Sequence, residues 1–240
     1  MDASQVLKQY FGYDSFRKGQ SDIIEAILQG QDALAIMPTG AGKSVCYQVP
    51  AMLLSGITIV ISPLISLMQD QVKSLNEAGI NAAYINSTLS EQQMYKALDY
   101  AAQGKYKIIY VAPERLETMS FMTFAQKADI SMVTIDEAHC ISQWGQDFRP
   151  SYLKIVDFID SLPERPVVSA FTATATSEVK TDIECILKLK SPKLVVTGFD
   201  RKNLYYSVEH LSGKKKDAYI AAYIKEHMDE SISQLYFQLL

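Results

Sequence analysis

The chain has 240 residues, of which 48% are hydrophobic and 21% are charged, which is close to the balance of an average soluble protein. Its formal net charge is −4, so bulk charge does not indicate nucleic acid, and any nucleic-acid surface must be a local patch. The three cysteines include no CxxC pair and no even set, which argues against a zinc cluster and a disulfide framework. The N-terminus lacks the features of a signal peptide and no apolar run approaches the ~18 residues of a membrane span, so we expect an intracellular protein.

Hydrophobic periodicity and breaker residues predict short strands that alternate with helices. The predicted helices span residues 3–11, 18–30 with Gly30 as C-cap, 42–54, 64–75, 90–102 with Ser90 as N-cap, 152–162, 177–189 and 214–227. The predicted strands span residues 33–37, 57–62, 82–86, 107–112, 131–135, 167–171, 194–198 and 204–209. Several strands are apolar on both faces, as in a parallel sheet covered by helices on both sides.

A glycine-rich loop follows the first predicted strand, and residues 33–44 read ALAIMPTGAGKS. Small residues let backbone N–H groups close around phosphate oxygens, and the start of the next helix adds partial positive charge. Lys43 can reach the β- and γ-phosphates, and the Ser44 hydroxyl can ligate Mg²⁺. Met37 stands where the strict pattern has glycine, so the match is incomplete. The competing interpretation is an ordinary strand-to-helix turn with a surface lysine.

Two adjacent carboxylates, Asp136 and Glu137, follow the strand predicted over residues 131–135. The first can hold hydrated Mg²⁺ opposite Ser44, and the second can orient or deprotonate the attacking water. Alone, the pair is equally compatible with two solvated acids. Together with the upstream phosphate loop, it predicts nucleoside triphosphate hydrolysis. Chemistry in parallel α/β folds gathers at the carboxyl ends of strands, so we expect these groups and Thr172 at one sheet edge.

Four further features have two interpretations each. Residues 13–20 combine an aromatic, an arginine and an amide, a composition that favours packing at the start of a helix. His139 is either a packing residue or a bridge from the nucleotide site to the loop that follows. That loop contains Trp144, the only tryptophan, which can stack on unpaired bases or anchor the loop in the core. The hydroxyls of Thr172 and Thr174 can relay hydrogen bonds from His139 to a bound strand or can simply cap the strand end.

Six motifs occur in order: FGYDSFRKGQ, MPTGAGKSVCYQ, SPLISLMQDQV, APERL, DEAHCISQWGQDFRPSY and FTATAT. With this combination the chain resembles the N-terminal motor lobe of RecQ-family DNA helicases, in superfamily 2, over about residues 5–230. The resemblance implies a three-layer RecA-like P-loop NTPase fold with a mostly parallel sheet, and the substitution at Met37 is normal in that superfamily. It also implies ATP-driven 3′→5′ translocation and duplex separation in DNA repair or recombination. The implied cofactors are ATP and Mg²⁺, and the implied partner is single-stranded or partially duplex DNA.

The resemblance also implies roles for individual residues, and Tyr13 would stack on adenine while Gln20 reads the base edge. The implied ATP-binding residues are Tyr13, Arg17, Gln20, Met37, Pro38, Thr39, Gly40, Ala41, Gly42, Lys43 and Ser44. The implied catalytic residues are Lys43, Asp136 and Glu137, with Ser44 and Asp136 on Mg²⁺. The residues implied in DNA binding and its coupling to hydrolysis are His139, Gln143, Trp144, Phe148, Arg149, Thr172 and Thr174. Residues 62–71 and 112–116 match the segments that follow the DNA backbone.

Domain limits follow from the same resemblance, with an ATP-binding domain over residues 1–210 and a linker helix in residues 211–240. Family motors have a second lobe that supplies an arginine finger. We expect that lobe to begin near Asp229, where the chain instead reads SISQLYFQLL and ends, as a truncated or frame-shifted sequence would. We therefore expect the chain to bind nucleotide weakly and not to unwind DNA alone. We also expect a cytoplasmic monomer, associated with the nucleoid if the protein is bacterial.

Two other functions remain open at this point. One is an isolated nucleotide- or DNA-binding lobe without helicase activity, acting through a partner. The other is an RNA helicase of the related DEAD/DEAH type, which the tetrad at residues 136–139 also fits. The stretches at residues 143–145 and 11–13 favour the RecQ interpretation.

Overall fold

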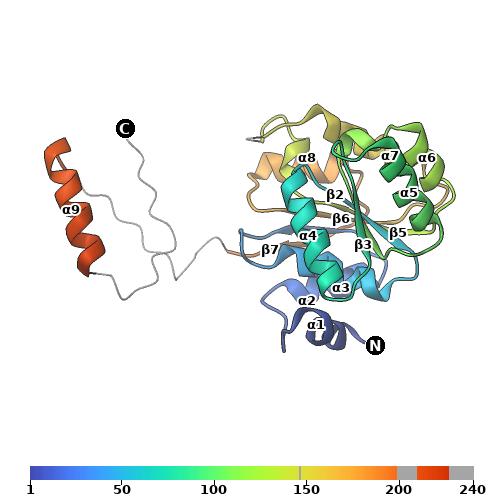
Figure 1. Cartoon of the computed structure of the whole chain (residues 1–240), viewed down its shortest axis with the longest axis horizontal. Coiled ribbons are helices and arrows are strands. Elements are labelled where there is room, and N and C mark those ends of the chain that lie inside the picture. The colour runs from blue at the N-terminus through green and yellow to red at the C-terminus, as the bar shows by residue number, and fades with distance from the viewer. Residues whose placement is uncertain (146, 199–209, 227–240) are drawn as a thin grey trace. The chain divides into compact units, whose positions relative to one another are not determined.

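The computed structural model describes residues 1–145, 147–198 and 210–226, and the chain divides into two compact units, Met1–Phe199 and Asp200–Leu240 (Figure 1). The described part of the second unit contains helix α9 (Gly213–Glu226), close to the prediction. The strand predicted over residues 204–209 lies outside the described residues, and the proposed domain limits at residues 210 and 211 remain a prediction. No helix in the described ranges is long and apolar enough to cross a membrane.

The first unit is built around a seven-stranded sheet in which every described pairing is parallel, in the order β3-β4-β2-β5-β6-β1-β7. The strands are β1 (Ala33–Ile36), β2 (Ile57–Ile61), β3 (Ala82–Ile85), β4 (Ile108–Val111), β5 (Ile130–Ile135), β6 (Val167–Thr172) and β7 (Lys193–Val196). The predicted α/β class is therefore confirmed, and each described strand was predicted to within two residues.

Helices cover both faces of this sheet (Figure 1). They are α1 (Ala3–Phe11), α2 (Gln20–Leu28), α3 (Lys43–Leu53), α4 (Ile65–Glu77), α5 (Glu91–Ala102), α6 (Met119–Ala125), α7 (Lys154–Ser161) and α8 (Ser177–Ile186). Helices α2, α3 and α4 pack on one face, with α1 outside α2 and α3, and helices α5 to α8 pack on the other.

Side-chain alternation along the strands explains this two-faced core. In β2, Ile59 and Ile61 contribute to the cluster under α5 to α8, whereas Val60 contributes to the cluster under α2 to α4. All three side chains are fully buried. A strand buried on both faces must be apolar at consecutive positions, which is the pattern that predicted this architecture.

Several helix limits differ from the predictions. Helix α6 was not predicted, although Phe121, Phe124 and Ala125 form its short buried stripe. The chain enters α7 through a 3-10 turn over Pro150–Leu153, because proline fits the first turn of a helix. Helix α8 ends at Ile186, three residues early, and the left-handed backbone of Lys188 (φ 48°) closes it.

Asp32, just before β1, connects three strands by hydrogen bonds at the edge of the sheet opposite the phosphate loop. Its carboxylate is 2% exposed and accepts hydrogen bonds from the Arg165 guanidinium at 2.6 and 3.1 Å. It also accepts from the backbone N–H groups of Val168 at 2.9 Å and Lys190 at 2.7 Å. The Asp32 carbonyl accepts from the N–H of Lys193 at 2.7 Å. This carboxylate therefore joins the start of β1 to β6 and to the turn before β7.

Candidate active site

The phosphate loop runs from the end of β1 to the first residue of α3. Its backbone needs glycine at two positions, because Gly40 and Gly42 have φ values of 82° and 80°. A Cβ on Gly42 would also lie 2.6 Å from Gln20 Nε2. No described side chain caps the N-terminus of α3, so its first N–H groups face the loop. Lys43 Nζ donates to the Met37 carbonyl at 3.2 Å, which holds the ammonium across the loop.

The segment before α2 is hydrogen-bonded to this loop, although composition alone favoured simple packing. Arg17 Nη1 donates to the Gly40 carbonyl at 2.6 Å. Gln20 is 3% exposed, and its Nε2 donates to the carbonyls of Ala41 and Gly42 at 3.2 and 3.1 Å. The Gln20 Oε1 accepts from the Arg17 N–H at 2.8 Å. In this structure the Gln20 amide therefore shapes the loop backbone, and its contact with adenine remains a prediction.

The acid pair lies directly after β5. Asp136 is 7% exposed, and its Oδ1 accepts from the Glu137 N–H at 3.0 Å. Glu137 has a left-handed backbone with φ 48°, a strained conformation for this residue type that is frequent at functional sites. Tyr152 stabilises the turn that follows β5, because its buried hydroxyl donates a hydrogen bond to the Asp136 carbonyl at 3.0 Å.

Both halves of the predicted ATPase site line one cavity of about 400 Å³. Its walls include Tyr13, Arg17, Gln20, Thr39, Gly40, Gly42, Lys43, Ser44, Asp136 and Glu137. Met37, Pro38 and Ala41 belong to the loop but are not among the lining residues. Tyr13 is 52% exposed at the cavity, so its ring is accessible for stacking. A larger cavity of about 970 Å³ lies between α5 and α6 and contains none of the predicted site residues.

Ser44 and Asp136 supply one hydroxyl and one buried carboxylate to the same cavity, and both are oxygen ligands. Mg²⁺ keeps several waters and is commonly held by one or two carboxylates together with substrate phosphates. No group of three or more His, Cys, Asp or Glu side chains suited to a metal occurs among the described residues. The residues present fit a magnesium ion carried by a nucleotide better than a cation held by protein alone.

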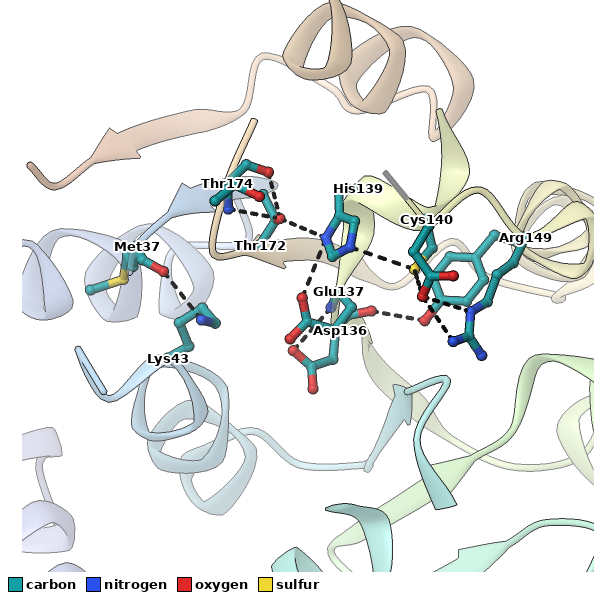
Figure 2. A network of polar contacts seen from close by, with 11 residues as sticks. Met37, Lys43, Asp136, Glu137, His139, Cys140, Arg149, Thr172 and Thr174 are labelled. Atoms are coloured by element: carbon teal, nitrogen blue, oxygen red, sulfur yellow. Dashed lines mark hydrogen bonds and ion pairs between the residues drawn. The ribbon is translucent and has the colours of Figure 1, made fainter. Parts of the chain in front are cut away.

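A relay of polar contacts leads from the acid pair to the end of β6 (Figure 2). His139 Nδ1 lies 2.9 Å from Thr172 Oγ1 and 3.3 Å from Glu137 Oε2. The Thr172 hydroxyl donates to the Thr174 carbonyl at 2.9 Å, so its single proton is already used. We therefore assign the Nδ1 proton to His139, which donates it to Thr172, while the same Nδ1 lies within 3.3 Å of Glu137 Oε2. The His139–Thr172 contact is therefore present, Thr174 takes part only through its backbone, and the role of these residues in coupling to DNA remains a prediction.

The loop after His139 exposes its aromatic residue. Trp144 is 77% exposed, so the interpretation of a buried anchor is wrong. Gly145 allows the turn, because a Cβ there would lie 2.5 Å from the His139 carbonyl oxygen. The Ser142 hydroxyl accepts from the Trp144 N–H at 3.1 Å and donates to Asp182 in α8 at 2.7 Å. The loop is thus held at its base while the indole faces solvent.

Arg149 closes the other side of this loop. Its guanidinium forms two hydrogen bonds with Asp147 Oδ2, at 3.1 and 2.8 Å, and a third with the Pro63 carbonyl at 3.3 Å. The Pro63 contact joins the loop to the segment before α4. Gln143 is exposed and Phe148 is half-buried on the same loop. The arginine is therefore paired within the protein, and its contact with DNA remains a prediction.

Sequence reasoning missed four kinds of support for the site. These are the Tyr152 hydroxyl under Asp136, the Asp147–Arg149 pair, the Ser142–Asp182 hydrogen bond and a buried polar cluster beside Tyr47. Tyr152 and Asp147 lie inside a motif that was recognised, but nothing in a linear pattern shows which backbone group a side chain will contact.

The pKa of the Asp136 carboxyl is raised from 3.8 to about 6, mainly by burial and secondly by the negative charge of Glu137. Between these two values the folded protein holds a proton that the unfolded chain has released. The stabilisation from this group is therefore complete below about pH 4 and is lost as the pH rises through 6. We predict that Asp136→Asn raises the free energy of unfolding by about 3 kcal/mol at pH 8 and by only about 0.5 kcal/mol at pH 4.

Urea unfolding in metal-free buffer at both pH values measures this difference. The exposed Asp14 provides the control, because Asp14→Asn should change neither value by more than about 0.5 kcal/mol. A destabilised Asp136→Asn variant at pH 8 would contradict the account.

The glycine-rich loop, the N-terminus of α3 and the acid pair at the carboxyl edge of a parallel sheet define a phosphate-loop nucleotide-binding lobe. Residues 17–182 match the DEAD/DEAH box helicase family, and the chain belongs to that family.

Within this family, the chain is similar to helicases of the RecQ group. The chain is 50% identical over 230 residues to ATP-dependent DNA helicase RecQ of Bacillus subtilis, covering 95% of this chain and 39% of that one. It is 47% identical over 207 residues to the RecQ helicase of Haemophilus influenzae, covering 86% of this chain and 33% of the relative. The predicted resemblance to RecQ helicases is confirmed, and the chain spans about two fifths of the length of the first relative.

Solved structures agree on the fold. A DUF1998 helicase, MrfA bound to DNA, superposes with a TM-score of 0.64 at 17% identity, over 82% of this chain and 29% of that one. A hypothetical ATP-dependent RNA helicase from Sulfolobus tokodaii gives a TM-score of 0.63 at 18% identity, over 81% of this chain and 56% of that one. At these identities the likeness shows a common helicase-domain fold.

Proposed function

We propose that the chain is the ATP-binding lobe of a 3′→5′ DNA helicase that couples hydrolysis of MgATP to movement along single-stranded DNA. The observation that supports this most strongly is the single cavity lined by the phosphate loop, Asp136 and Glu137. The relatives that carry the RecQ name support DNA as the substrate.

The residues that line the cavity have different roles in ATP binding and hydrolysis. Backbone N–H groups of the loop and of α3 bind the phosphates, and the Lys43 ammonium neutralises charge on the β- and γ-oxygens. Bound Mg²⁺ would supply further charge neutralisation beside Ser44 and Asp136. The Glu137 carboxylate is positioned to orient the attacking water and to accept its proton. Tyr13 would stack on the base.

The relay from Glu137 through His139 would couple DNA binding to ATP hydrolysis. A strand that binds at the exposed Trp144 and displaces the loop changes the backbone at His139, since Gly145 packs against the His139 carbonyl. The Nδ1 atom of His139 in turn lies 3.3 Å from Glu137 Oε2. The position of the general base is therefore sensitive to the state of the aromatic loop.

We predict that Trp144→Ala weakens single-stranded DNA binding by about 5- to 150-fold, because stacking on one aromatic ring contributes about 1–3 kcal/mol. Nucleotide affinity without DNA should stay within about twofold of the parent, since Trp144 does not line the ATP cavity. Fluorescence anisotropy of a labelled oligo(dT) measures the first value, and titration with a fluorescent ATP analogue measures the second. Tyr95→Ala, at another exposed aromatic residue, is the control. Unchanged affinity for oligo(dT) would contradict a DNA contact at Trp144.

Steady-state phosphate release from MgATP tests the proposed function. Turnover that rises with single-stranded DNA, and rises less with RNA of the same sequence, is the expected result. Stimulation by RNA alone would favour the related RNA helicases. Nucleotide binding without turnover would favour the alternative function, a binding lobe that acts only with a second lobe. We further propose that the chain is a cytoplasmic monomer, and sedimentation of the purified chain tests the monomeric state.

A further inference from the structure

A buried polar cluster lies between the phosphate-loop helix α3 and helix α4. Gln48 of α3 is 4% exposed, and its Nε2 donates to Gln71 Oε1 at 2.9 Å and to the Tyr110 hydroxyl at 3.0 Å. The Tyr110 hydroxyl lies 3.4 Å from the hydroxyl of Tyr47. Both protons of the Gln48 amide nitrogen are therefore used, and they join α3 to α4 and to β4.

Both ends of this cluster reach the nucleotide cavity. Tyr47 and Gln71 are lining residues of the cavity, whereas Gln48 and Tyr110 lie behind it. The Tyr47 ring packs edge-on against Phe171, with the ring centroids 5.3 Å apart. Phe171 precedes Thr172, the acceptor in the relay from His139. The cluster thus touches the ATP cavity, the strand that carries the relay and the helix that follows Pro63.

The hydroxyls remain neutral donors and acceptors over the working pH range. Burial is the main cause that raises the pKa of Tyr110 to about 12, and burial also raises the pKa of Tyr47 well above its ordinary value. A Tyr110 hydroxyl that accepts from Gln48 has its own proton left for Tyr47. Either hydroxyl can be the donor between Tyr110 and Tyr47, and in both cases the cluster connects Gln48 through Tyr110 to Tyr47.

We propose that the Gln48–Gln71 hydrogen bond, held in place by the Tyr110 and Tyr47 hydroxyls, is a positioning link through which nucleotide binding orders helix α4. This inference rests on the proposed nucleotide site and adds a connection from that site to α4, separate from the relay that leads from Glu137 through His139 to Thr172. The link is polar and its Gln48 side is buried, so it holds one relative placement of α3 and α4, whereas an apolar contact would tolerate sliding. Gln48 and Tyr110 act through Gln71 and Tyr47 and touch no substrate.

Hydrogen exchange of the full chain, with and without a non-hydrolysable ATP analogue and Mg²⁺, tests the link. In the parent, the analogue should slow exchange in peptides from the phosphate loop and from α4 (Ile65–Glu77). In Gln48→Leu, the slowing at the phosphate loop should persist, while the slowing at α4 falls by about two- to tenfold, the effect of one net hydrogen bond. Tyr110→Phe removes only the hydroxyl and should give a smaller loss in the same direction.

Matched controls are Gln103→Leu and Tyr106→Phe, which lie on the opposite face of the sheet and should behave as the parent. If the analogue slows hydrogen exchange in α4 equally in Gln48→Leu and in the parent, the link is overturned and the nucleotide site stands. The same conclusion follows if the analogue has no effect on exchange in α4 of the parent. If the analogue does not slow exchange at the phosphate loop of the parent, both the link and the proposed nucleotide site are overturned. Should Gln48→Leu fail to fold, Tyr110→Phe decides the question by the same criterion.

Discussion

Replacing Lys43 by alanine is expected to abolish ATP turnover and to weaken ATP binding by about ten- to a hundredfold. The ammonium lies in the cavity that Asp136 also lines and is held over the loop by the Met37 carbonyl. Its loss removes a charge-assisted hydrogen bond to the phosphates, which contributes about 1.5–3 kcal/mol. The acidic pair would then face the triphosphate with less positive charge beside it, so the transition state should be affected more than the ground state.

Calorimetric titration with MgATP measures the loss of affinity, and phosphate release measures the loss of turnover. Lys8→Ala is the matched control, because Lys8 lies on α1 and forms an exposed ion pair with Asp14. Parent-like binding in Lys43→Ala would refute the assignment of the phosphate loop.

Asp32→Ala is expected to lower the free energy of unfolding by about 3–5 kcal/mol, the range for removing one partner of a buried ion pair. The change leaves the Arg165 guanidinium without its carboxylate and leaves two backbone N–H groups, of Val168 and Lys190, without their acceptor. Each unsatisfied buried group adds its own desolvation cost. The effect should be structural only, because Asp32 lies at the amino end of β1 and the phosphate loop lies at the other end.

Urea unfolding followed by circular dichroism gives this value, with Asp14→Ala as the exposed control that should change it by less than about 1 kcal/mol. ATP affinity measured well below the unfolding midpoint should equal that of the parent. A loss under about 1 kcal/mol in Asp32→Ala would show that the carboxylate does not fasten the three strands.

The strands and most helices were predictable because the sheet is buried on both faces. Apolar residues at consecutive positions, as in Ile57–Ile61, distinguish such strands from solvated ones. Helix α5 was placed to the residue, since Ser90 and Gln93 form a capping box that is visible in the sequence. Helix α6 was missed because seven residues without a capping side chain give too short a pattern. The end of α8 depends on the left-handed Lys188, which no local signal marks.

For the site, motif spacing located the phosphate loop and the acid pair, and the parallel topology brought them to one edge. Composition alone favoured burial of Trp144, because tryptophan prefers burial, and only the resemblance to RecQ helicases implied the accessible indole that the structure has. The hydrogen bonds of Gln20 to the loop carbonyls were equally hidden, as they join residues more than twenty positions apart. Long-range polar contacts therefore account for most of what the sequence left undecided.

The emission of Trp144 offers the most direct test that the nucleotide site and a DNA-binding loop work as one device. It is the only tryptophan of the chain and is 77% exposed, so its fluorescence reports on the aromatic loop alone. Titration with oligo(dT) should quench this emission as bases stack on the indole, and the midpoint should shift when a non-hydrolysable ATP analogue and Mg²⁺ are present. Emission that stays unchanged while anisotropy shows the oligonucleotide to be fully bound, or a midpoint indifferent to the analogue, would contradict the account.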